Sequence, residues 1–245
     1  MKGPILSNHF TRHMALTSPT IVVLLCWLIL LFQLTAQAKT VPDEDIPTYY
    51  VYLAGPEVFL PDPIAPGVEK KAVIESLNEK HKWPFKLVGL YPMDNEIENF
   101  APDYATGIKI YQANIALMDQ AHFVTANMVR FRGPSMDVGT AFEMGYMNGL
   151  GKPVFAYYDA KPFYGEDEKP GIYAERVKKF YPVSETQSGK DIHGQSIEDF
   201  AMADNLMMIG ALESGSGDIA TSFESAIMQI AESIKAKTEV YSIPK

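Results

Sequence analysis

Residues 122–158 read HFVTANMVRFRGPSMDVGTAFEMGYMNGLGKPVFAYY, and this stretch decides the fold. Its two ends, residues 122–127 and 154–158, are short apolar runs typical of buried strands. Between them, Asp137 is a good N-cap for a helix that runs from residue 138 to about residue 150. Two apolar strands joined through a helix indicate a parallel pair with a crossover connection.

The same alternation continues on both sides of this stretch. Apolar periodicity and β-branched or aromatic runs predict strands at 48–53 and 85–90 and helices at 67–82, 103–120 and 223–234. Strands that are apolar almost throughout are typical of a parallel sheet with helices on both faces, so the sequence predicts an α/β fold. Residues 159–200 are polar and too long for a simple connection, and segments of this kind are often lids or subunit contacts.

The N-terminus has the organisation of an export signal. Lys2 and Arg12 precede an unbroken apolar run at 21–32, and Ala36-Gln37-Ala38 matches the small-x-small pattern that a signal peptidase cleaves. The run has twelve residues, whereas a membrane-spanning helix needs about 20. A cleaved signal at 1–38 is therefore favoured over an uncleaved membrane anchor.

This interpretation divides the chain into a signal at 1–38, a polar linker at 39–47 and a folded domain at 48–245. The protein is expected to be periplasmic or secreted. The alternative is a membrane-anchored protein that contacts the bilayer only through residues 21–32.

Composition excludes several classes of function. The chain has 30 acidic and 21 basic residues, and no stretch forms the basic stripe that would neutralise a phosphate backbone, so a nucleic-acid polymer is not an expected partner. A single cysteine permits no intrachain disulfide and no paired-cysteine zinc motif. The five histidines form no metal-binding spacing, and no metal is expected.

Candidate site residues follow two of the predicted strands, because ligands of open α/β sheets bind beyond the carboxyl ends of the strands. After the first strand, small residues would let a ligand approach the backbone closely. The candidates in these two turns are Tyr52, Gly55, Pro56, Arg132, Gly133, Asp137 and Glu143.

Glu143 is the strongest of these candidates. Its neighbours in the predicted helix are apolar, and an isolated carboxylate in such a setting needs a partner or a task. Gly145 and Gly149 would let the helix press against the sheet and carry Glu143 towards the strand ends. The alternative is that Glu143 is an exposed surface residue.

Asp137 and Arg132 each have two interpretations. Asp137 can cap the helix with one carboxylate oxygen and hold a sugar hydroxyl with the other. Arg132 can bind an anion, or it can be a solvated ion-pair partner on the surface.

Three segments in the correct order resemble the nucleoside 2-deoxyribosyltransferase family. They are YLAGPEVF at 52–59, FRGPSMDVGTAFEMGYMNGLGKPVFAY at 131–157 and DNLMM at 204–208. The resemblance implies a flavodoxin-like sheet of five parallel strands, transfer of a 2-deoxyribosyl group between nucleobases, a role in nucleoside salvage and no cofactor.

The resemblance also implies roles for individual residues. Glu143 is similar to the family's nucleophile, and Tyr52 is similar to the tyrosine that orients it. Asp137 resembles the carboxylate that binds the sugar hydroxyls. Asn205 resembles an asparagine that enters the site from a neighbouring subunit, which implies a homo-oligomer with shared sites.

One position departs from the family pattern. The family commonly carries an aspartate just before the third strand, where this chain has His122, with Asp119 three residues earlier. If His122 faces the base, it could protonate the departing base near neutral pH. The alternative is a core histidine that points into the sheet.

Three functions remain open from the sequence. In the first, Glu143 attacks the anomeric carbon and transfers the sugar to a second base by a retaining double displacement. In the second, water replaces the acceptor base, and the protein hydrolyses (deoxy)nucleosides or their 5′-monophosphates. In the third, the protein binds nucleosides without catalysis.

Overall fold

The computed structural model describes residues 46–97 and 100–242, including the side chains of all but 239–242. Contacts divide the chain into Met1–Ile46 and Pro47–Lys245, and the helices and strands of the described residues belong to the second unit. The predicted signal at 1–38 and apolar run at 21–32 lie outside the described residues. Within those residues, no helix is both long enough and apolar enough to span a membrane.

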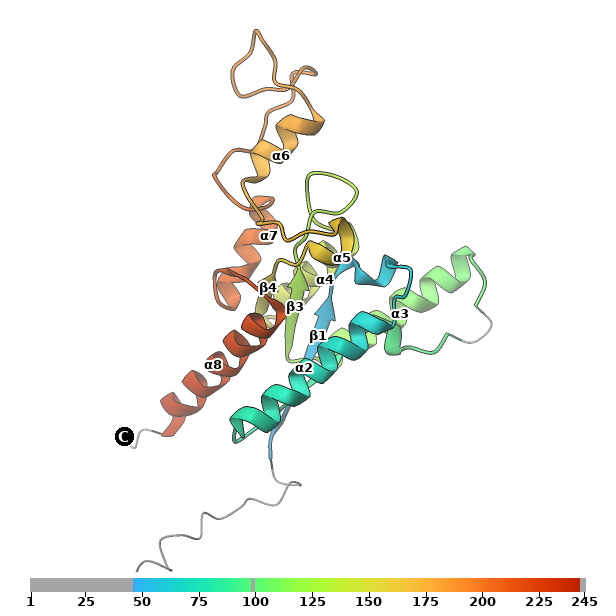
Figure 1. Cartoon of the computed structure of the whole chain (residues 1–245), viewed down its shortest axis with the longest axis vertical. Coiled ribbons are helices and arrows are strands. Elements are labelled where there is room, and N and C mark those ends of the chain that lie inside the picture. The colour runs from blue at the N-terminus through green and yellow to red at the C-terminus, as the bar shows by residue number, and fades with distance from the viewer. Residues whose placement is uncertain (1–45, 98–99, 243–245) are drawn as a thin grey trace, which may run out of the picture. The chain divides into compact units, whose positions relative to one another are not determined.

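In the described part of the chain, five parallel strands form one sheet in the order β2-β1-β3-β4-β5 (Figure 1). Their bounds are β1 Thr48–Ala54, β2 Lys86–Leu90, β3 Phe123–Asn127, β4 Val154–Tyr157 and β5 Ile219–Ala220. The predicted α/β class and the five-stranded parallel sheet are confirmed. The pattern had not located β5, because two residues carry no periodicity.

Helices cover both faces of the sheet. The α-helices are α2 Ala65–His81, α3 Tyr104–Gln120, α4 Val138–Gly149, α5 Lys161–Tyr164, α6 Tyr173–Phe180, α7 Leu206–Ala211 and α8 Phe223–Ser242, and the short 3₁₀ helices are η2 Pro56–Phe59, η3 Pro92–Asp94 and η4 Leu212–Ser214. Helices α2 and α8 pack on one face, and α3, α4 and α7 pack on the other (Figure 1).

Strand β1 shows why both faces must be apolar. Val51 and Leu53 join the core under α2 and α8. Tyr52 and Ala54, which point the opposite way, join the core under α3 and α4. Alternate side chains of a strand point to opposite faces, so a strand covered on both sides is apolar throughout.

The expected contact of Gly145 and Gly149 with the sheet is wrong. Both glycines are exposed, and a Cβ added at either would meet nothing within 4 Å. Helix α4 instead buries Thr140, Met144 and Met147, which recur at steps of four and three on one face. The larger side chains decide which face packs, because they bury more apolar surface.

The polar segment between β4 and α7, residues 158–205, forms an ordered arm. It contains α5 and α6, and isolated antiparallel bridges pair Val183 with Asp191 and Lys190 with Ser196. In Figure 1, α6 and its loops extend beyond the carboxyl ends of the strands. The arm returns to the sheet through α7, which packs against α4.

Candidate active site

Tyr52 and Glu143 form a direct side-chain pair. The Tyr52 hydroxyl donates a hydrogen bond to Glu143 Oε1 at 2.6 Å. Tyr52 is fully buried in β1, and Glu143 is half-buried in the second turn of α4. The interpretation of Glu143 as a free surface residue is therefore wrong, because its carboxylate faces the sheet.

The surroundings change the acidity of both groups. Burial is the main cause that raises the pKa of Glu143 to about 7; the Tyr52 hydrogen bond opposes this rise, and the nearby Asp137 carboxylate adds to it. Burial, followed by the charge of Glu143, raises the pKa of Tyr52 far above its usual range. Tyr52 therefore stays protonated as a donor, while Glu143 titrates near neutral pH and becomes a nucleophile when it loses its proton.

Asp137 caps α4 as the sequence predicts. Its Oδ2 accepts hydrogen bonds from the Thr140 backbone N–H at 2.8 Å and from Thr140 Oγ1 at 3.0 Å. Its Oδ1 makes no hydrogen bond to any residue that the structure describes. Asp137 thus keeps one carboxylate oxygen free of hydrogen bonds to the described residues, six residues before Glu143, whose pKa its charge raises.

Gly55 has a different task from the one expected of it. A Cβ at Gly55 would lie 2.0 Å from Glu57 Oε2, so the missing side chain makes room for a neighbouring carboxylate and not for a ligand. Pro56 is buried and starts the η2 turn that directs Glu57 inwards. Both residues shape the turn after β1.

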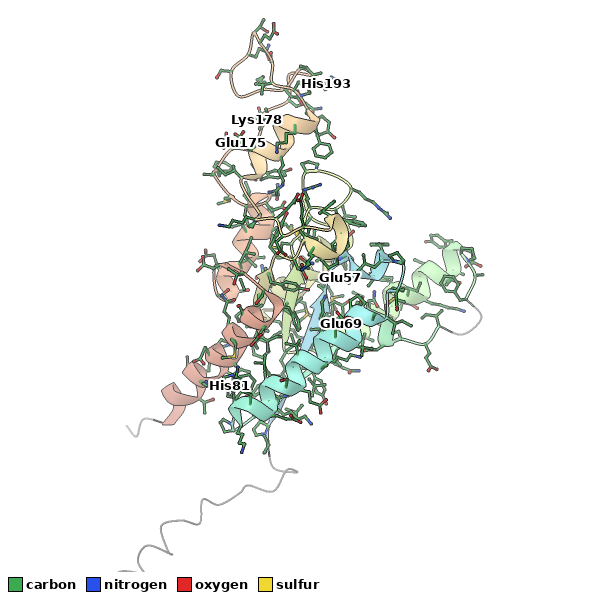
Figure 2. The ribbon with its side chains drawn as sticks, viewed as in Figure 1. Glu57, Glu69, His81, Glu175, Lys178 and His193 are labelled. Carbon is green, nitrogen blue, oxygen red and sulfur yellow. The ribbon has the colours of Figure 1, made fainter. Side chains whose placement is uncertain are left out.

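Glu57 is a buried anchor that the sequence pattern did not reveal. Its Oε1 accepts hydrogen bonds from Asn127 Nδ2 at 3.0 Å and from the Tyr157 hydroxyl at 3.1 Å, and it lies 2.8 Å from Lys70 Nζ. Figure 2 shows Glu57 near the carboxyl ends of the strands. One carboxylate thereby ties the turn after β1 to β3, β4 and α2. The available signal was a glutamate between a Gly-Pro turn and two apolar residues.

A cavity of about 470 Å³ lies beside this anchor. Its polar lining includes Glu57, Lys70, Tyr157 and Asp159, and its apolar lining comes largely from α2 and the loop before it. Neither Tyr52 nor Glu143 lines it. The cavity lies on the α2 and α8 side of the sheet, and the Tyr52–Glu143 pair lies on the α4 side.

His122 and Asp119 are not brought to the Tyr52–Glu143 pair by any hydrogen bond of the described residues. His122 directly precedes β3, and its Nδ1 accepts from the Tyr50 backbone N–H at 3.0 Å. Burial, followed by the charge of Lys152, lowers its pKa, which makes it a weaker proton carrier at neutral pH. Asp119 accepts a hydrogen bond from the Tyr146 hydroxyl at 2.7 Å. His122 is exposed, so its interpretation as a core histidine is wrong. It lies at the amino end of β3, whereas Glu143 is paired with Tyr52 near the carboxyl end of β1.

Arg132 and Gly133 lie in the loop between β3 and α4. The Arg132 guanidinium lies 5.0 Å from the Phe59 ring centre and 4.7 Å from that of Phe131, in an exposed cation–π cluster. A Cβ at Gly133 would meet nothing within 4 Å, so no close backbone contact in this chain requires a glycine there.

Asn205 begins α7 as its N-cap. Its side chain accepts from the Met207 backbone N–H and donates to Glu198 Oε2 at 2.7 Å. Neither bond reaches Tyr52 or Glu143 of the same chain. In residues 46–97 and 100–242, no group of three or more acidic, histidine or cysteine side chains is placed to hold a metal ion.

The chain is similar in sequence and in fold to several known proteins. The sequence profile described as nucleoside 2-deoxyribosyltransferase matches residues 51–207. A solved structure of a 2-desoxiribosyltransferase from Leishmania mexicana is 27% identical, with a TM-score of 0.50, covering 75% of this chain and 97% of that one. An uncharacterized protein of Schizosaccharomyces pombe is 28% identical over 179 residues, covering 71% of this chain and 81% of that protein.

Proposed function

The chain belongs to the nucleoside 2-deoxyribosyltransferase family, and we propose that it transfers a 2-deoxyribosyl group between nucleobases through a covalent intermediate on Glu143. The observation that carries the proposal is the 2.6 Å hydrogen bond from the Tyr52 hydroxyl to Glu143 Oε1. It fixes a half-buried carboxylate beside the carboxyl ends of β1 and β3, where α/β sheets bind ligands.

The proposed reaction has two displacements. The Glu143 carboxylate attacks C1′ of the nucleoside, the N-glycosidic bond breaks, and the departing base keeps the bonding electrons and takes up a proton. A ring nitrogen of a second base then attacks C1′, loses its proton and releases the carboxylate. Two inversions give overall retention at C1′.

The residues around Glu143 suit both steps. Tyr52 holds Oε1, which leaves Oε2 to form the bond to C1′. Positive charge develops on the sugar as the base departs, and the carboxylates of Glu143 and Asp137 stabilise it. The unbonded Oδ1 of Asp137 is suited to accept a hydrogen bond from a sugar hydroxyl.

Base exchange tests this proposal. The folded protein, incubated with thymidine and adenine, is expected to form deoxyadenosine and thymine. Release of free deoxyribose in the absence of an acceptor base would instead indicate the hydrolase. Nucleoside binding that survives Glu143→Ala, with no turnover by the wild type, would indicate a non-catalytic binding protein.

We also propose that the protein works as a homo-oligomer. Helices α3 and α4 expose large apolar side chains, which we call the apolar surface: Tyr104, Ile108, Tyr111, Val138 and Phe142. The ring centres of Tyr111 and Phe142 lie 6.2 Å apart across the two helices. Tyr104 and Val138 are 86% and 84% exposed, which is costly for side chains of this kind unless a partner covers them. A second copy on this surface would approach the end of the sheet at which α4 and α7 begin, where Asn205 could serve its neighbour.

Residues 1–38 are proposed to export the protein. N-terminal sequencing of the protein purified from its native compartment is expected to begin at Lys39. A native N-terminus upstream of residue 21 would support the membrane anchor instead.

A further inference from the structure

Asp204 is a buried carboxylate that joins two distant segments of the chain. It is 1% exposed. Its Oδ1 accepts from Ser135 Oγ at 2.5 Å and from the Asn205 backbone N–H at 2.7 Å. Its Oδ2 accepts from the Met136 backbone N–H at 3.1 Å and from Arg176 Nη2 at 3.3 Å. A buried charge is stable only when it is paired and hydrogen-bonded, and both oxygens of Asp204 meet that condition.

Arg176 completes the connection from the arm. Its guanidinium donates to the carbonyl oxygens of Pro134 at 2.5 Å and Ala203 at 2.6 Å, and also to that of Pro170. The same side chain therefore holds the loop before α4 and the segment before α7. We call Asp204 and Arg176 together the clamp.

The two segments that the clamp joins carry two candidate substrate-binding side chains. Met136 directly precedes Asp137, the N-cap of α4, and Asp204 directly precedes Asn205, the N-cap of α7. Helices α4 and α7 also pack against each other. A shift of the clamp would thus move the first turns of both helices together with their capping side chains.

We propose that Asp204 is a positioning residue for sugar recognition, an inference that rests on the function proposed above. By fixing Ser135 and the backbone of Met136, it sets the direction of the Asp137 carboxylate, whose Oδ2 is held by Thr140 and whose Oδ1 meets the sugar. The arm between β4 and α7 then has a function in its own subunit, because its Arg176 and Asp204 hold the loop that carries Asp137.

Asp204→Asn tests the proposal, with Asp191→Asn as its matched control. Asp191 is also buried in the arm, but it accepts from the His193 and Gln195 backbone N–H groups in the loop beyond α6, where Figure 2 labels His193. The measured quantity is the ratio of kcat/KM for thymidine to that for 3′,5′-dideoxythymidine, which lacks both of the sugar hydroxyls that Asp137 could bind.

Asp204→Asn is expected to lower this ratio about tenfold, the size of a lost hydrogen bond to a charged group. Asp191→Asn is expected to leave the ratio unchanged even where it lowers the thermal midpoint. An unchanged ratio in folded Asp204→Asn would overturn the proposal. If that variant does not fold, Ser135→Ala takes its place, with a smaller decrease expected and an unchanged ratio again contradicting the proposal.

Hydrogen exchange separates this inference from the proposed function. Wild-type protein that turns over neither nucleoside would defeat the proposed function, and the clamp would then be judged from the amides of residues 136–141. Faster exchange of these amides in Asp204→Asn, with no such change in Asp191→Asn, would support positioning by the clamp. If Asp204→Asn does not fold, Ser135→Ala is compared with Asp191→Asn in its place. Equal exchange in the variant and the control would overturn it.

Discussion

The hydroxyl of Tyr52 opposes what burial does to Glu143. Burial and the Asp137 charge raise the pKa of Glu143 to about 7, while the Tyr52 hydrogen bond favours the ionised form. An acidity near neutral pH suits a group that must be ionised to attack and must also leave the sugar again in the second step. Tyr52 is therefore expected to act on the pH dependence as well as on geometry.

Tyr52→Phe tests this role. Wild-type kcat/KM is expected to rise with pH and to level off above about pH 7, as Glu143 loses its proton. Without the hydroxyl, the pKa of Glu143 rises, so the acid limb of the profile moves to higher pH and the rate at pH 7 falls. Tyr49→Phe, a change in the same strand, is the control. A slower variant whose pH profile is unshifted would contradict the electrostatic role. Tyr52 would then act only by orienting the Glu143 carboxylate.

Glu143→Gln tests the same burial through stability. The folded state holds the Glu143 proton up to about pH 7, above the usual 4.5, so this group's contribution to wild-type stability is complete below pH 4.5 and is lost as the pH rises through 7. Glutamine carries no charge at any pH. Thermal denaturation is expected to place the variant above the wild type at pH 8, with the difference declining towards pH 4. A difference that does not depend on pH would show that the Glu143 carboxyl is not buried.

The sequence predicted some of these residues and missed others for physical reasons. Glu143, Tyr52 and Asp137 were found because a motif or a helix boundary marks them. Glu57 was not predicted, because no local sequence feature shows that Lys70, Asn127 and Tyr157 converge on its carboxylate. These partners come from three separate elements, and only the folded chain brings them together.

Helix α4 shows how one residue can serve both an element and the site. Asp137 caps the helix by accepting a hydrogen bond from the Thr140 backbone N–H, and its second carboxylate oxygen is available for a substrate. Asparagine caps helices about as well as aspartate, whereas alanine loses about 1 kcal/mol. The two roles can therefore be separated by substitution.

Asp137→Asn is expected to keep the thermal midpoint close to that of the wild type while raising KM for thymidine about tenfold or more, because a charged acceptor is replaced. Asp137→Ala is expected to lose both stability and binding. Denaturation and steady-state kinetics of the two variants provide the comparison. Equal destabilisation by both substitutions, with KM unaffected by asparagine, would leave Asp137 with a capping role alone.

The long elements were predictable and the short ones were not. Strands β1 to β4 and helices α2, α3, α4 and α8 each contain enough residues to show a period. Strand β5 has two residues and α5 has four, so neither can show one. The packed face of α4 differs from the predicted one, because Met144 and Met147 bury more apolar surface than the glycines at 145 and 149.

At the scale of the whole molecule, the apolar surface on α3 and α4 predicts assembly. Tyr104→Glu combined with Tyr111→Glu places two charges on that surface, and light scattering is expected to show dissociation. Transfer activity should fall at least tenfold, because Asn205 would no longer reach a neighbouring site. Val68→Glu is the control, since Val68 is 61% exposed on α2, on the other side of the sheet. A double variant that remains assembled, or a monomer with full activity, would refute the shared site.

The sequence pattern alone also does not predict which surface would form a subunit contact. The family resemblance implied a neighbour's asparagine, but periodicity could not show that the exposed ring of Tyr111 on α3 lies beside that of Phe142 on α4. The sequence pattern did not predict the structure of the arm after β4 for the same reason. Arg176 and Asp204 of the arm form hydrogen bonds to the loop before α4, which is distant along the chain.

Mass spectrometry of the intact protein after brief incubation with a deoxynucleoside, without an acceptor base, is the sharpest test of a glycosyl intermediate on Glu143. A mass increase equal to one deoxyribosyl group, located on Glu143 by peptide mapping and lost when adenine is added, is the expected result. Glu143→Gln should show no such increase. Base exchange that proceeds with the unmodified protein throughout, or an adduct on any other residue, would contradict the proposed mechanism.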